Sequence, residues 1–337
     1  MIEIKTKDLQ NKLNQLAIGA KNNKYLFCNN GYLTTNSFGI RVDVELETDL
    51  TFCVFFPDFY KYIKALKTET IILDINEEVL TLKSSRRKSK FVLAEKELCH
   101  YPREVQTADM EQLEVKEQFD DFIGLISKIN HSNSQDLNKK TVFFSENKLM
   151  FSDGVIMLIK KFDKSFGHQF GVEMESLKKL KGYEINSFAF DDSDLVCIFD
   201  GGRLIFKKIG FDNVPDFDRV INGLEGFKPV NFPAEVMDDI KEFDSTSVIS
   251  IGDTTRVLKF NFTKDFVIVS ASNHMGETEV KYKLESESEL EFKIDSKYLI
   301  PKSIIENSEV EIVKGGMDII KFENEIEKLL IIIQGRR

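Results

Sequence analysis

The sequence predicts an α+β fold made of three similar domains, each with two helices packed on antiparallel sheets. Three observations carry this prediction. The chain has 337 residues, which is too long for a single domain with one hydrophobic core, since a typical domain holds about 100–150 residues. The same order of predicted helices and strands occurs three times along the chain. The segments between the helices alternate apolar and polar residues, as the strands of hairpins do.

Each predicted unit begins with an amphipathic helix. These helices span residues 8–20, 116–131 and 233–243, so that they recur at a nearly constant interval. Asp8 and Pro233 are residue types that start helices. In each helix the apolar residues recur at helical spacing and form one stripe: Leu9, Leu13, Leu16 and Ala20, then Phe119, Phe122, Ile123 and Ile126, then Val236, Ile240 and Phe243.

A second, shorter helix follows in each unit, over residues 57–67, 174–181 and 295–307. Pro57 suits a first helical turn, and Asp295 with Ser296 can cap the third of these helices. Three units with the same internal order are hard to obtain by chance, so the repeat is stronger support than any single helix boundary.

The remaining apolar segments are predicted as strands. Boundaries between the units are expected near residues 106–111 and 223–230, which gives domains 1–108, 109–225 and 226–337. The predicted strands are 27–35, 40–47, 50–56, 71–75, 79–83 and 90–94 in the first unit, 141–145, 148–152, 155–162, 187–191, 195–199 and 203–209 in the second, and 247–251, 257–262, 266–270, 277–284, 310–314, 319–323 and 329–333 in the third.

The charge of the chain limits how it could bind nucleic acid. Lys and Arg number 46 and Asp and Glu 56, so the formal net charge is −10 and a general basic coat is excluded. A DNA partner would therefore require positive charge concentrated on one surface. The N-terminus has no apolar signal core, and no run of about 18 apolar residues occurs, so we expect a cytoplasmic protein without membrane association.

No arrangement of residues predicts catalysis or a metal site. Cys28, Cys53, Cys99 and Cys197 are scattered among apolar neighbours and are expected to be buried free thiols. The four histidines are isolated, without metal-ligand spacing or a partnered nucleophile. We therefore expect no cofactor and no enzymatic activity.

Lysines concentrate on the predicted helices. The six helical segments with their adjoining residues sum to +3, whereas the rest of the chain sums to −13. This contrast favours a mildly positive helical surface that holds phosphates without reading sequence, although ordinary solvated helix faces would carry lysines too. The acidic helix at 233–243 fits such a surface poorly. The candidate DNA-facing residues are Lys12, Lys21, Lys24, Lys61, Lys64, Lys67, Lys128, Lys178, Lys179, Lys181, Lys297 and Lys302.

Several short motifs resemble bacterial β sliding clamps, the DNA polymerase III beta subunit family. In that family the first two domains close with an aromatic–proline–acidic stretch, to which Tyr101-Pro102 and residues 214–221 (VPDFDRVI) are similar. Residues 151–158 (FSDGVIML) resemble its Thr-Asp-Gly-containing strand and turn, and residues 291–299 with the final strand 329–333 resemble its C-terminal layout. The resemblance covers essentially the whole chain at low identity and fits a divergent or phage-encoded member.

The resemblance implies a closed ring of two head-to-tail chains, with strands outside and twelve helices lining a central hole. It implies a non-enzymatic processivity factor for DNA replication that encircles double-stranded DNA and binds a DNA polymerase and a clamp loader. A structural β-rich assembly protein, or an enzyme of unrecognised chemistry, remains the alternative, although lysine-bearing helices in a threefold repeat have no evident role in the former.

The resemblance also implies a hydrophobic pocket for short partner peptides. The family's usual His-Arg after Asp-Gly is replaced here by Val155-Ile156, and the C-terminal residues are 334–337 (QGRR), so we expect a more apolar pocket. A plain hairpin at Asp-Gly and a core strand for the final isoleucines are the simpler interpretations. Carried over by position, the pocket residues are Phe144, Ser152, Gly154, Val155, Ile156 and Met157 on one side and Ile331, Ile332 and Ile333 on the other.

Overall fold

The computed structural model describes the chain apart from a set of short segments and its last four residues. The described residues are 1–20, 24–37, 39–76, 78–85, 87–95, 102–114, 118–127, 135–162, 165–167, 169–211, 214–246, 257–273, 276–284, 289–300, 302–313, 318–324 and 327–333. The predicted strand 247–251, the predicted site residues Lys21 and Lys128, and the tail 334–337 lie outside them.

The chain divides into two compact units, which are described separately. Unit 1 comprises Met1–Asp120 and Glu175–Lys208, and unit 2 comprises Asp121–Met174 and Ile209–Arg337. Each unit therefore holds part of the middle segment of the sequence. The division into three domains stays a prediction.

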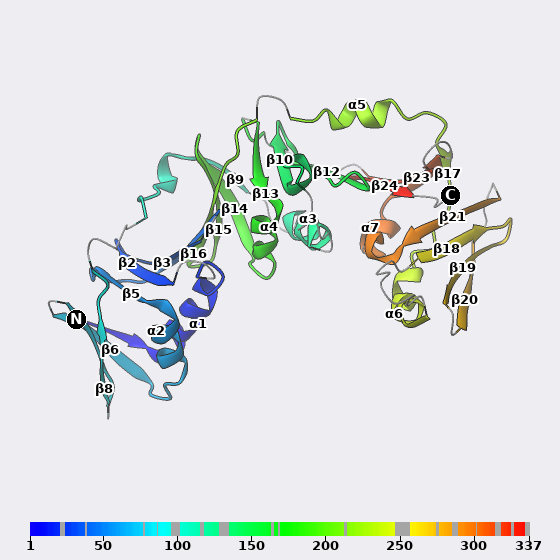
Figure 1. Cartoon of the computed structure of the whole chain (residues 1–337). Coiled ribbons are helices and arrows are strands. Elements are labelled where there is room, and N and C mark those ends of the chain that lie inside the picture. The colour runs from blue at the N-terminus through cyan, green and yellow to red at the C-terminus, as the bar shows by residue number, and fades with distance from the viewer. Residues whose placement is uncertain are drawn as a thin grey trace. The chain divides into compact units, whose positions relative to one another are not determined.

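Unit 1 contains a four-stranded and an eight-stranded antiparallel sheet (Figure 1). The small sheet has the order β1-β6-β7-β8, and the large sheet has the order β5-β2-β3-β4-β16-β15-β14-β9. Its elements are β1 (Ile2–Lys5), α1 (Thr6–Leu16), β2 (Tyr25–Asn29), β3 (Tyr32–Ser37), β4 (Ile40–Glu45), β5 (Phe52–Phe55), α2 (Phe56–Lys64), β6 (Thr70–Asn76), β7 (Val79–Lys83), β8 (Lys88–Val92), η1 (Thr107–Asp109), β9 (Glu111–Glu114), η3 (Lys178–Leu180), β14 (Ile185–Phe190), β15 (Asp194–Phe199) and β16 (Gly202–Lys207).

Unit 2 repeats this arrangement. Its large sheet has the order β13-β10-β11-β12-β24-β23-β22-β17, and its small sheet has the order β20-β19-β18-β21. Its elements are η2 (Asn138–Lys140), β10 (Thr141–Ser145), β11 (Lys148–Ser152), β12 (Ile156–Lys161), β13 (Phe170–Glu173), α5 (Phe217–Asn222), β17 (Lys228–Pro229), α6 (Val236–Thr246), β18 (Val257–Phe262), β19 (Phe266–Asn273), β20 (Gly276–Lys283), β21 (Leu290–Asp295), η4 (Ser296–Tyr298), α7 (Lys302–Glu306), β22 (Glu309–Val313), β23 (Asp318–Glu323) and β24 (Glu327–Ile333). Two further helices, α3 (Gln118–Ile126) and α4 (Met174–Leu177), run from one unit into the other.

The six predicted helices are confirmed, with shifted ends. The first helix of each predicted unit corresponds to α1, α3 and α6, and the second to α2, to α4 with η3, and to η4 with α7. The sequence reasoning missed the strands β1, β9, β13 and β17 and the helix α5. These elements are short, so hydrophobic periodicity has few residues in which to show itself.

Apolar stripes hold the first two helices on their sheets. Leu9, Leu13 and Leu16 of α1 are fully buried, as the spacing predicts. The amide of Gln10 donates to the Ile63 carbonyl oxygen of α2 at 2.9 Å and to the Leu66 carbonyl oxygen just after α2 at 3.1 Å. The two helices therefore form one packed layer.

The two faces of the large sheet of unit 1 differ, and α1 packs on one of them. The Thr35 hydroxyl donates to the Leu16 carbonyl oxygen of α1 at 2.7 Å, whereas the hydroxyl of the adjacent Thr34 donates to Asp43 at 2.8 Å. Successive strand residues point to opposite faces, so Asp43 lies on the face away from α1. None of the helices in the described part of the chain is long and apolar enough to cross a membrane.

Candidate functional site

The candidate peptide site lies on the large sheet of unit 2, where the last strand of the chain joins the middle ones. Strand β24 pairs with β12 on one side and with β23 on the other. Ile331 is opposite Ile156, and Met157 is opposite Leu330. The sheet thus brings the two predicted sides of the pocket together, although they are far apart in sequence.

The Asp-Gly turn that precedes β12 is the predicted hairpin. The Asp153 carboxylate accepts the backbone N–H of Val155 at 2.6 Å and that of Ile156 at 2.7 Å. Gly154 has a φ of +87°, a conformation that favours glycine. The turn is therefore fixed by its own side chain, and it leaves Gly154 exposed and Val155 half-buried at the start of the strand.

One face of this sheet carries an apolar cluster that includes Met157. Phe143, Met150 and Ile159 are buried there, and half-buried Met157 packs against them. Ile319 of β23 belongs to the same cluster, which therefore extends across β24. This is the surface at which an apolar peptide side chain could be anchored.

Two predicted pocket residues are directed away from this surface, and their assignment to the pocket is corrected. Phe144 is fully buried and stacks on Phe170, with ring centroids 4.6 Å apart. Ile156 is 4% exposed. Phe144 is adjacent in sequence to Phe143 of the apolar cluster, and Ile156 is adjacent to Met157. Since successive strand residues point to opposite faces, Phe144 and Ile156 lie on the other face of the sheet.

The remaining predicted pocket residues follow the register. Ser152 is opposite Met157 and shares its face. Position 332 is opposite Ile319, whereas position 331 is opposite Ile320 on the other face. Of the isoleucines at 331–333 only the strand pairing is described, so their role in the pocket stays a prediction.

Helix α5 covers part of the same apolar cluster and was missed as a helix. Phe217 and Ile221 are buried against Phe143 and its neighbours, and Val220 is 52% exposed beside them. The Asp216 side chain accepts the backbone N–H of Arg219 at 2.8 Å and caps the helix. The sequence contained the signal, since a capping aspartate precedes two apolar residues four positions apart.

Charged residues lie beside the cluster on β22 and β23. Lys321 forms ion pairs with Glu311 and, at 3.0 Å, with Glu323, and its ammonium lies 4.9 Å from the centre of the Phe227 ring. Burial alone would lower the pKa of Lys321, but its hydrogen bonds to the two carboxylates outweigh burial and raise it. Lys321 therefore stays charged at neutral pH.

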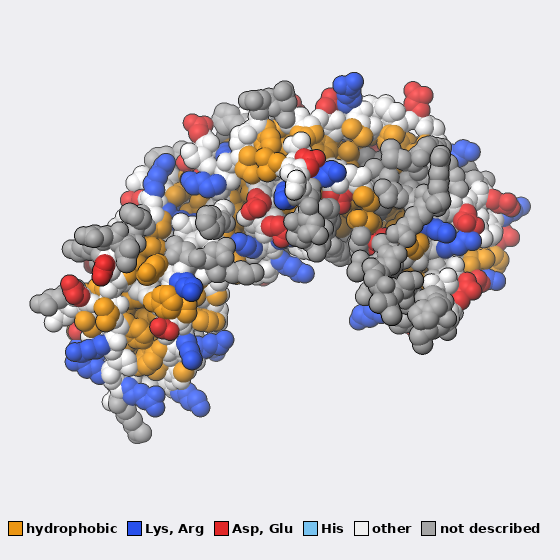
Figure 2. Space-filling view, viewed as in Figure 1, with side chains coloured by type: hydrophobic (Ala, Val, Ile, Leu, Met, Phe, Trp, Pro, Cys, Tyr) orange, Lys and Arg blue, Asp and Glu red, His pale blue; other side chains and the backbone are white. Residues whose placement is uncertain are grey.

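The predicted DNA-facing lysines of α2 and of the residues just after it are exposed. Lys61, Lys64 and Lys67 extend into solvent, and Lys64 lies 5.3 Å from the centre of the Tyr60 ring. Lys and Arg side chains gather around the end of unit 1 that holds α2 and the small sheet (Figure 2). Lys24 and Lys181 are also exposed.

Other predicted lysines have partners within the chain. Lys12 donates to the Glu45 carbonyl oxygen at 2.6 Å, and Lys178 pairs with Glu175 at 2.6 Å. Lys302 pairs with Asp238 of α6, and the hydrogen bond raises the pKa of Lys302. These three lysines have less freedom to move toward a phosphate than those of α2.

Two assignments on the helical surface stay predictions. Lys179 is half-buried on η3, and Lys297 lies on η4 with its side chain outside the described ones. The acidic helix α6 is partly neutralised, because Asp238 pairs with Lys302 and Asp239 accepts the Tyr282 hydroxyl at 2.7 Å. Helix α6 therefore presents less negative charge than its sequence implies.

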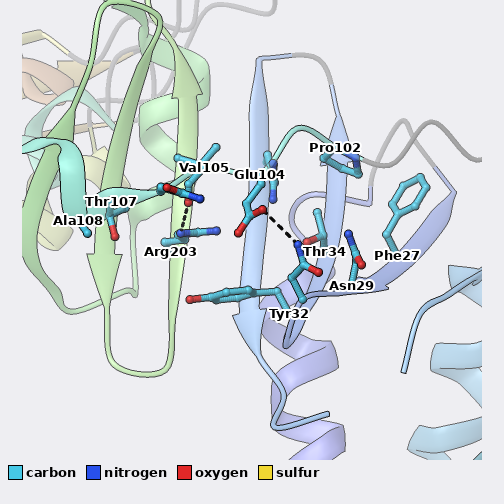
Figure 3. A pocket seen from close by; sticks show the side chains of 13 residues that line it. Phe27, Asn29, Tyr32, Thr34, Pro102, Glu104, Val105, Thr107, Ala108 and Arg203 are labelled. Atoms are coloured by element: carbon cyan, nitrogen blue, oxygen red, sulfur yellow. Dashed lines mark hydrogen bonds between the residues drawn. The ribbon is translucent and has the colours of Figure 1, made fainter. Parts of the chain in front are cut away.

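Sequence reasoning missed an ionic network on the large sheet of unit 1. Asp43 is fully buried and accepts from Arg41 at 2.6 Å and 2.8 Å and from Arg203 at 2.9 Å. Arg203 also donates to the Val105 carbonyl oxygen at 2.7 Å, and Arg41 donates to the Arg103 carbonyl oxygen. Arg41 and Arg203 of this network line a cavity of about 320 Å³, together with residues of the segment 102–108 (Figure 3).

Comparisons with known proteins give the fold. No protein-family model and no curated protein matches the sequence. Solved structures match over nearly the whole chain. A protein described as a DNA polymerase III beta subunit from Eubacterium rectale has a TM-score of 0.79 at 10% identity and covers 99% of both chains.

Two further solved structures agree. The Helicobacter pylori beta clamp bound to a DNA ligase peptide has a TM-score of 0.78 at 15% identity, over 99% of this chain and 100% of that one. The DNA polymerase III subunit beta from Pseudomonas aeruginosa has a TM-score of 0.75 at 14% identity and covers 99% of both chains. The chain described here therefore has the fold of bacterial DNA sliding clamps.

Proposed function

We propose that this protein is a DNA sliding clamp, a processivity factor that encircles duplex DNA and tethers a replicative DNA polymerase. The observation that carries the proposal is the match to clamp structures over 99% of the chain. The role is that of a tether in the cytoplasm, so it requires a closed ring, a surface for DNA and a site for partners, and no catalytic group.

Ring closure is supported by the repeat of the sheets. In the large sheets the central strand pairs are β4 with β16 and β12 with β24. Strand β20 occupies the edge position in its small sheet that β4 and β12 occupy in their halves of the large sheets, and β8 occupies the position of β16 and β24. Pairing β20 of one chain with β8 of a second chain would form the same eight-stranded order and remove both edges.

The register within unit 1 predicts which residues would meet. Asp43, the fourth residue of β4, is opposite Arg203 of β16. Counted from the first residue of each strand, Asp43 of β4 corresponds to Glu279 of β20; counted back from the last residue, Arg203 of β16 corresponds to Lys88 of β8. The edge strands would therefore place Glu279 opposite Lys88, and the pair two residues along would be Glu277 opposite Lys90. All four side chains are at least partly exposed in the single chain, and their charges are complementary.

A cysteine pair tests this interface. Residues directly opposite in neighbouring strands have the Cα separation that a disulfide needs. We expect Lys88→Cys combined with Glu279→Cys to give a covalent ring of two chains on oxidation. Lys88→Cys combined with Lys281→Cys, displaced by two residues, is the matched control and should stay uncrosslinked. Equal crosslinking of both variants, or a monomer by native mass spectrometry, would contradict the proposed ring.

The proposed hold on DNA is weak and spread over many lysines. The exposed lysines of α2, with Lys24 and Lys181, are the strongest candidates, because their side chains extend into solvent. Lysines in such positions bind phosphates, carry no sequence information, and bind more weakly as salt rises. Lys12, Lys178 and Lys302 would contribute less.

The proposed partner site is the apolar surface around Met157. A peptide with aliphatic or aromatic anchors would contact Met157, Val155 and Val220, with Ser152 and Gly154 offering polar groups at the rim. Position 332 of β24, which is opposite Ile319, would close the far side. A DNA polymerase and the clamp loader are the partners we propose, and both would compete for this one surface.

A further inference from the structure

The cavity in unit 1 occupies the same place in its sheet as the proposed peptide site occupies in the sheet of unit 2. Counted from the first residue of β4 and of β12, Arg41 corresponds to Met157 and Asp43 corresponds to Ile159. Both pairs lie beside the central strand pairing of an eight-stranded sheet. The same backbone platform therefore carries apolar side chains in one unit and an ionic network in the other.

Arg203 in this network has hydrogen-bonding capacity to spare. Its side chain is 9% exposed, and it donates through Nε to Asp43 and through Nη1 to the Val105 carbonyl oxygen. A guanidinium has five N–H groups, and among the described residues none accepts from Nη2. A buried cation with open donors is stabilised when an anion or water completes its shell.

The surroundings of Arg203 favour a planar anion. The centre of the Tyr32 ring lies 4.5 Å from the guanidinium carbon, and Figure 3 shows the two groups side by side at the cavity. Stacking of this kind holds the guanidinium plane in a fixed direction. Asn29, Thr34 and Gln106 line the same cavity and add polar groups. A carboxylate matches the fork of a guanidinium with two parallel hydrogen bonds.

The buried positive charges of the network outnumber its buried negative charge by one, so one further negative group could be bound. Two buried or nearly buried arginines, Arg41 and Arg203, share the single carboxylate of Asp43. Glu104 on the covering segment also reaches the cavity, but it is exposed and accepts one long hydrogen bond, 3.3 Å, from Asn30. Glu104 therefore shows that the cavity accommodates a carboxylate, and a ligand could displace it.

We propose that this cavity binds the carboxylate of an acidic residue in a partner protein, with Arg203 as the anchoring cation. A phosphate would offer similar chemistry. The cavity, however, lies on the face away from α1, whereas Lys61 and Lys64, which are proposed to hold DNA, lie on α2, the helix that contacts α1. The site goes beyond the proposed clamp function, since a ring can encircle DNA whether or not this cavity is filled.

Blocked amino acids provide a direct probe. N-acetyl-glutamate N-methylamide is titrated into the full-length protein while the Arg Nε–H and Tyr ring resonances are followed by NMR, and the matched glutamine derivative is the control. We expect the glutamate probe to shift the Arg203 and Tyr32 signals saturably and the glutamine probe to leave them unchanged. Equal shifts with both probes, or no saturable shift, would overturn the proposal.

Two variants and a phosphate titration complete the test. Arg203→Gln should abolish the response, provided that circular dichroism shows a folded protein. Glu104→Gln changes only an exposed side chain and should tighten binding about threefold, because it removes a competing negative charge. Unchanged affinity in Glu104→Gln would count against the site. Phosphate that displaces the glutamate probe at lower concentration would reassign the cavity to phosphate groups. Retention on DNA is measured separately, so failure here leaves the clamp proposal standing.

Discussion

The two large sheets have the same strand order but opposite chemistry at their centres. In unit 1 the strand pairing of β4 with β16 carries Asp43 between Arg41 and Arg203. In unit 2 the pairing of β12 with β24 is bordered by Met157 and Ile159. The backbone repeat thus sets where a site can form, and the side chains decide what it can bind.

The difference also bears on the peptide site, which we propose for unit 2 alone. In unit 1 the arginines hold the carbonyl groups of Arg103 and Val105, so the covering segment is fastened across the sheet. In unit 2 the corresponding connection forms α5, which packs through Phe217 and Ile221 and leaves Val220 exposed. An apolar peptide would gain apolar contact area in unit 2, whereas in unit 1 it would have to desolvate charged groups at a cost in free energy.

The largest expected effect follows from breaking the ionic centre. Asp43→Asn keeps the shape of the side chain but removes the charge that two arginines share. We expect a loss of about 3–5 kcal/mol in the free energy of unfolding, since an unpaired buried charge is costly. Chemical denaturation monitored by circular dichroism measures it. A loss below about 1 kcal/mol would mean that water replaces the carboxylate at little cost.

The second effect concerns partner binding at the apolar centre. Met157→Ser should weaken binding of a polymerase-derived peptide about tenfold or more, because the substitution removes an anchoring side chain, while the half-buried position limits the change in stability. Lys61→Ala is the matched control and should leave peptide affinity unchanged. Normal affinity in Met157→Ser, measured by calorimetry, would remove Met157 from the site.

A smaller effect is expected on the salt dependence of DNA binding. Removing one lysine that binds a phosphate should lower the slope of log affinity against log salt by about 1. Lys61→Ala and Lys67→Ala should each do so, whereas Lys178→Ala should change the slope less, because Lys178 pairs with Glu175. Equal slopes for all three variants would show that the α2 lysines face away from DNA.

The smallest effect is a pH dependence near the apolar centre. The pKa of Lys321 is raised in the folded protein, so its contribution to stability is fully present below the unfolded-state pKa of about 10.4 and is lost as pH rises through the folded value. The wild-type protein should therefore lose more stability between about pH 9 and pH 11 than Lys321→Met does. Urea denaturation at the two pH values makes the comparison, and equal losses would contradict it.

Much of the fold was predictable because it repeats. The apolar stripes of α1 and α3 and the turn at Asp153-Gly154 are local signals, and the repeat reinforces each of them. The Met157 surface was predictable only in part. The resemblance indicated which strands form the surface, but it did not indicate which face of the sheet carries it. Phe144 and Ile156 were therefore assigned to this surface, although strand alternation places them on the opposite face.

The ionic network could not have been read from the sequence. Asp43 and Arg203 are 160 positions apart, and the residues around each of them in its strand give no signal of an ionic network. Their meeting depends on the register between β4 and β16, which a single sequence does not specify. The pairings of Lys12 with Glu45 and of Lys302 with Asp238 are long-range in the same way, which is why a count of helical lysines overestimates those available to DNA.

The central claim is topological, and one measurement addresses it directly. The protein is loaded with its clamp loader and ATP onto a nicked circular plasmid, isolated on that plasmid by gel filtration, and the plasmid is then cut once with a restriction enzyme. A ring that encircles DNA stays on the circle and slides off the linear form, so the protein should leave the DNA fraction after cutting. Retention on the linear DNA, or no loader-dependent retention on the circle, would contradict the account.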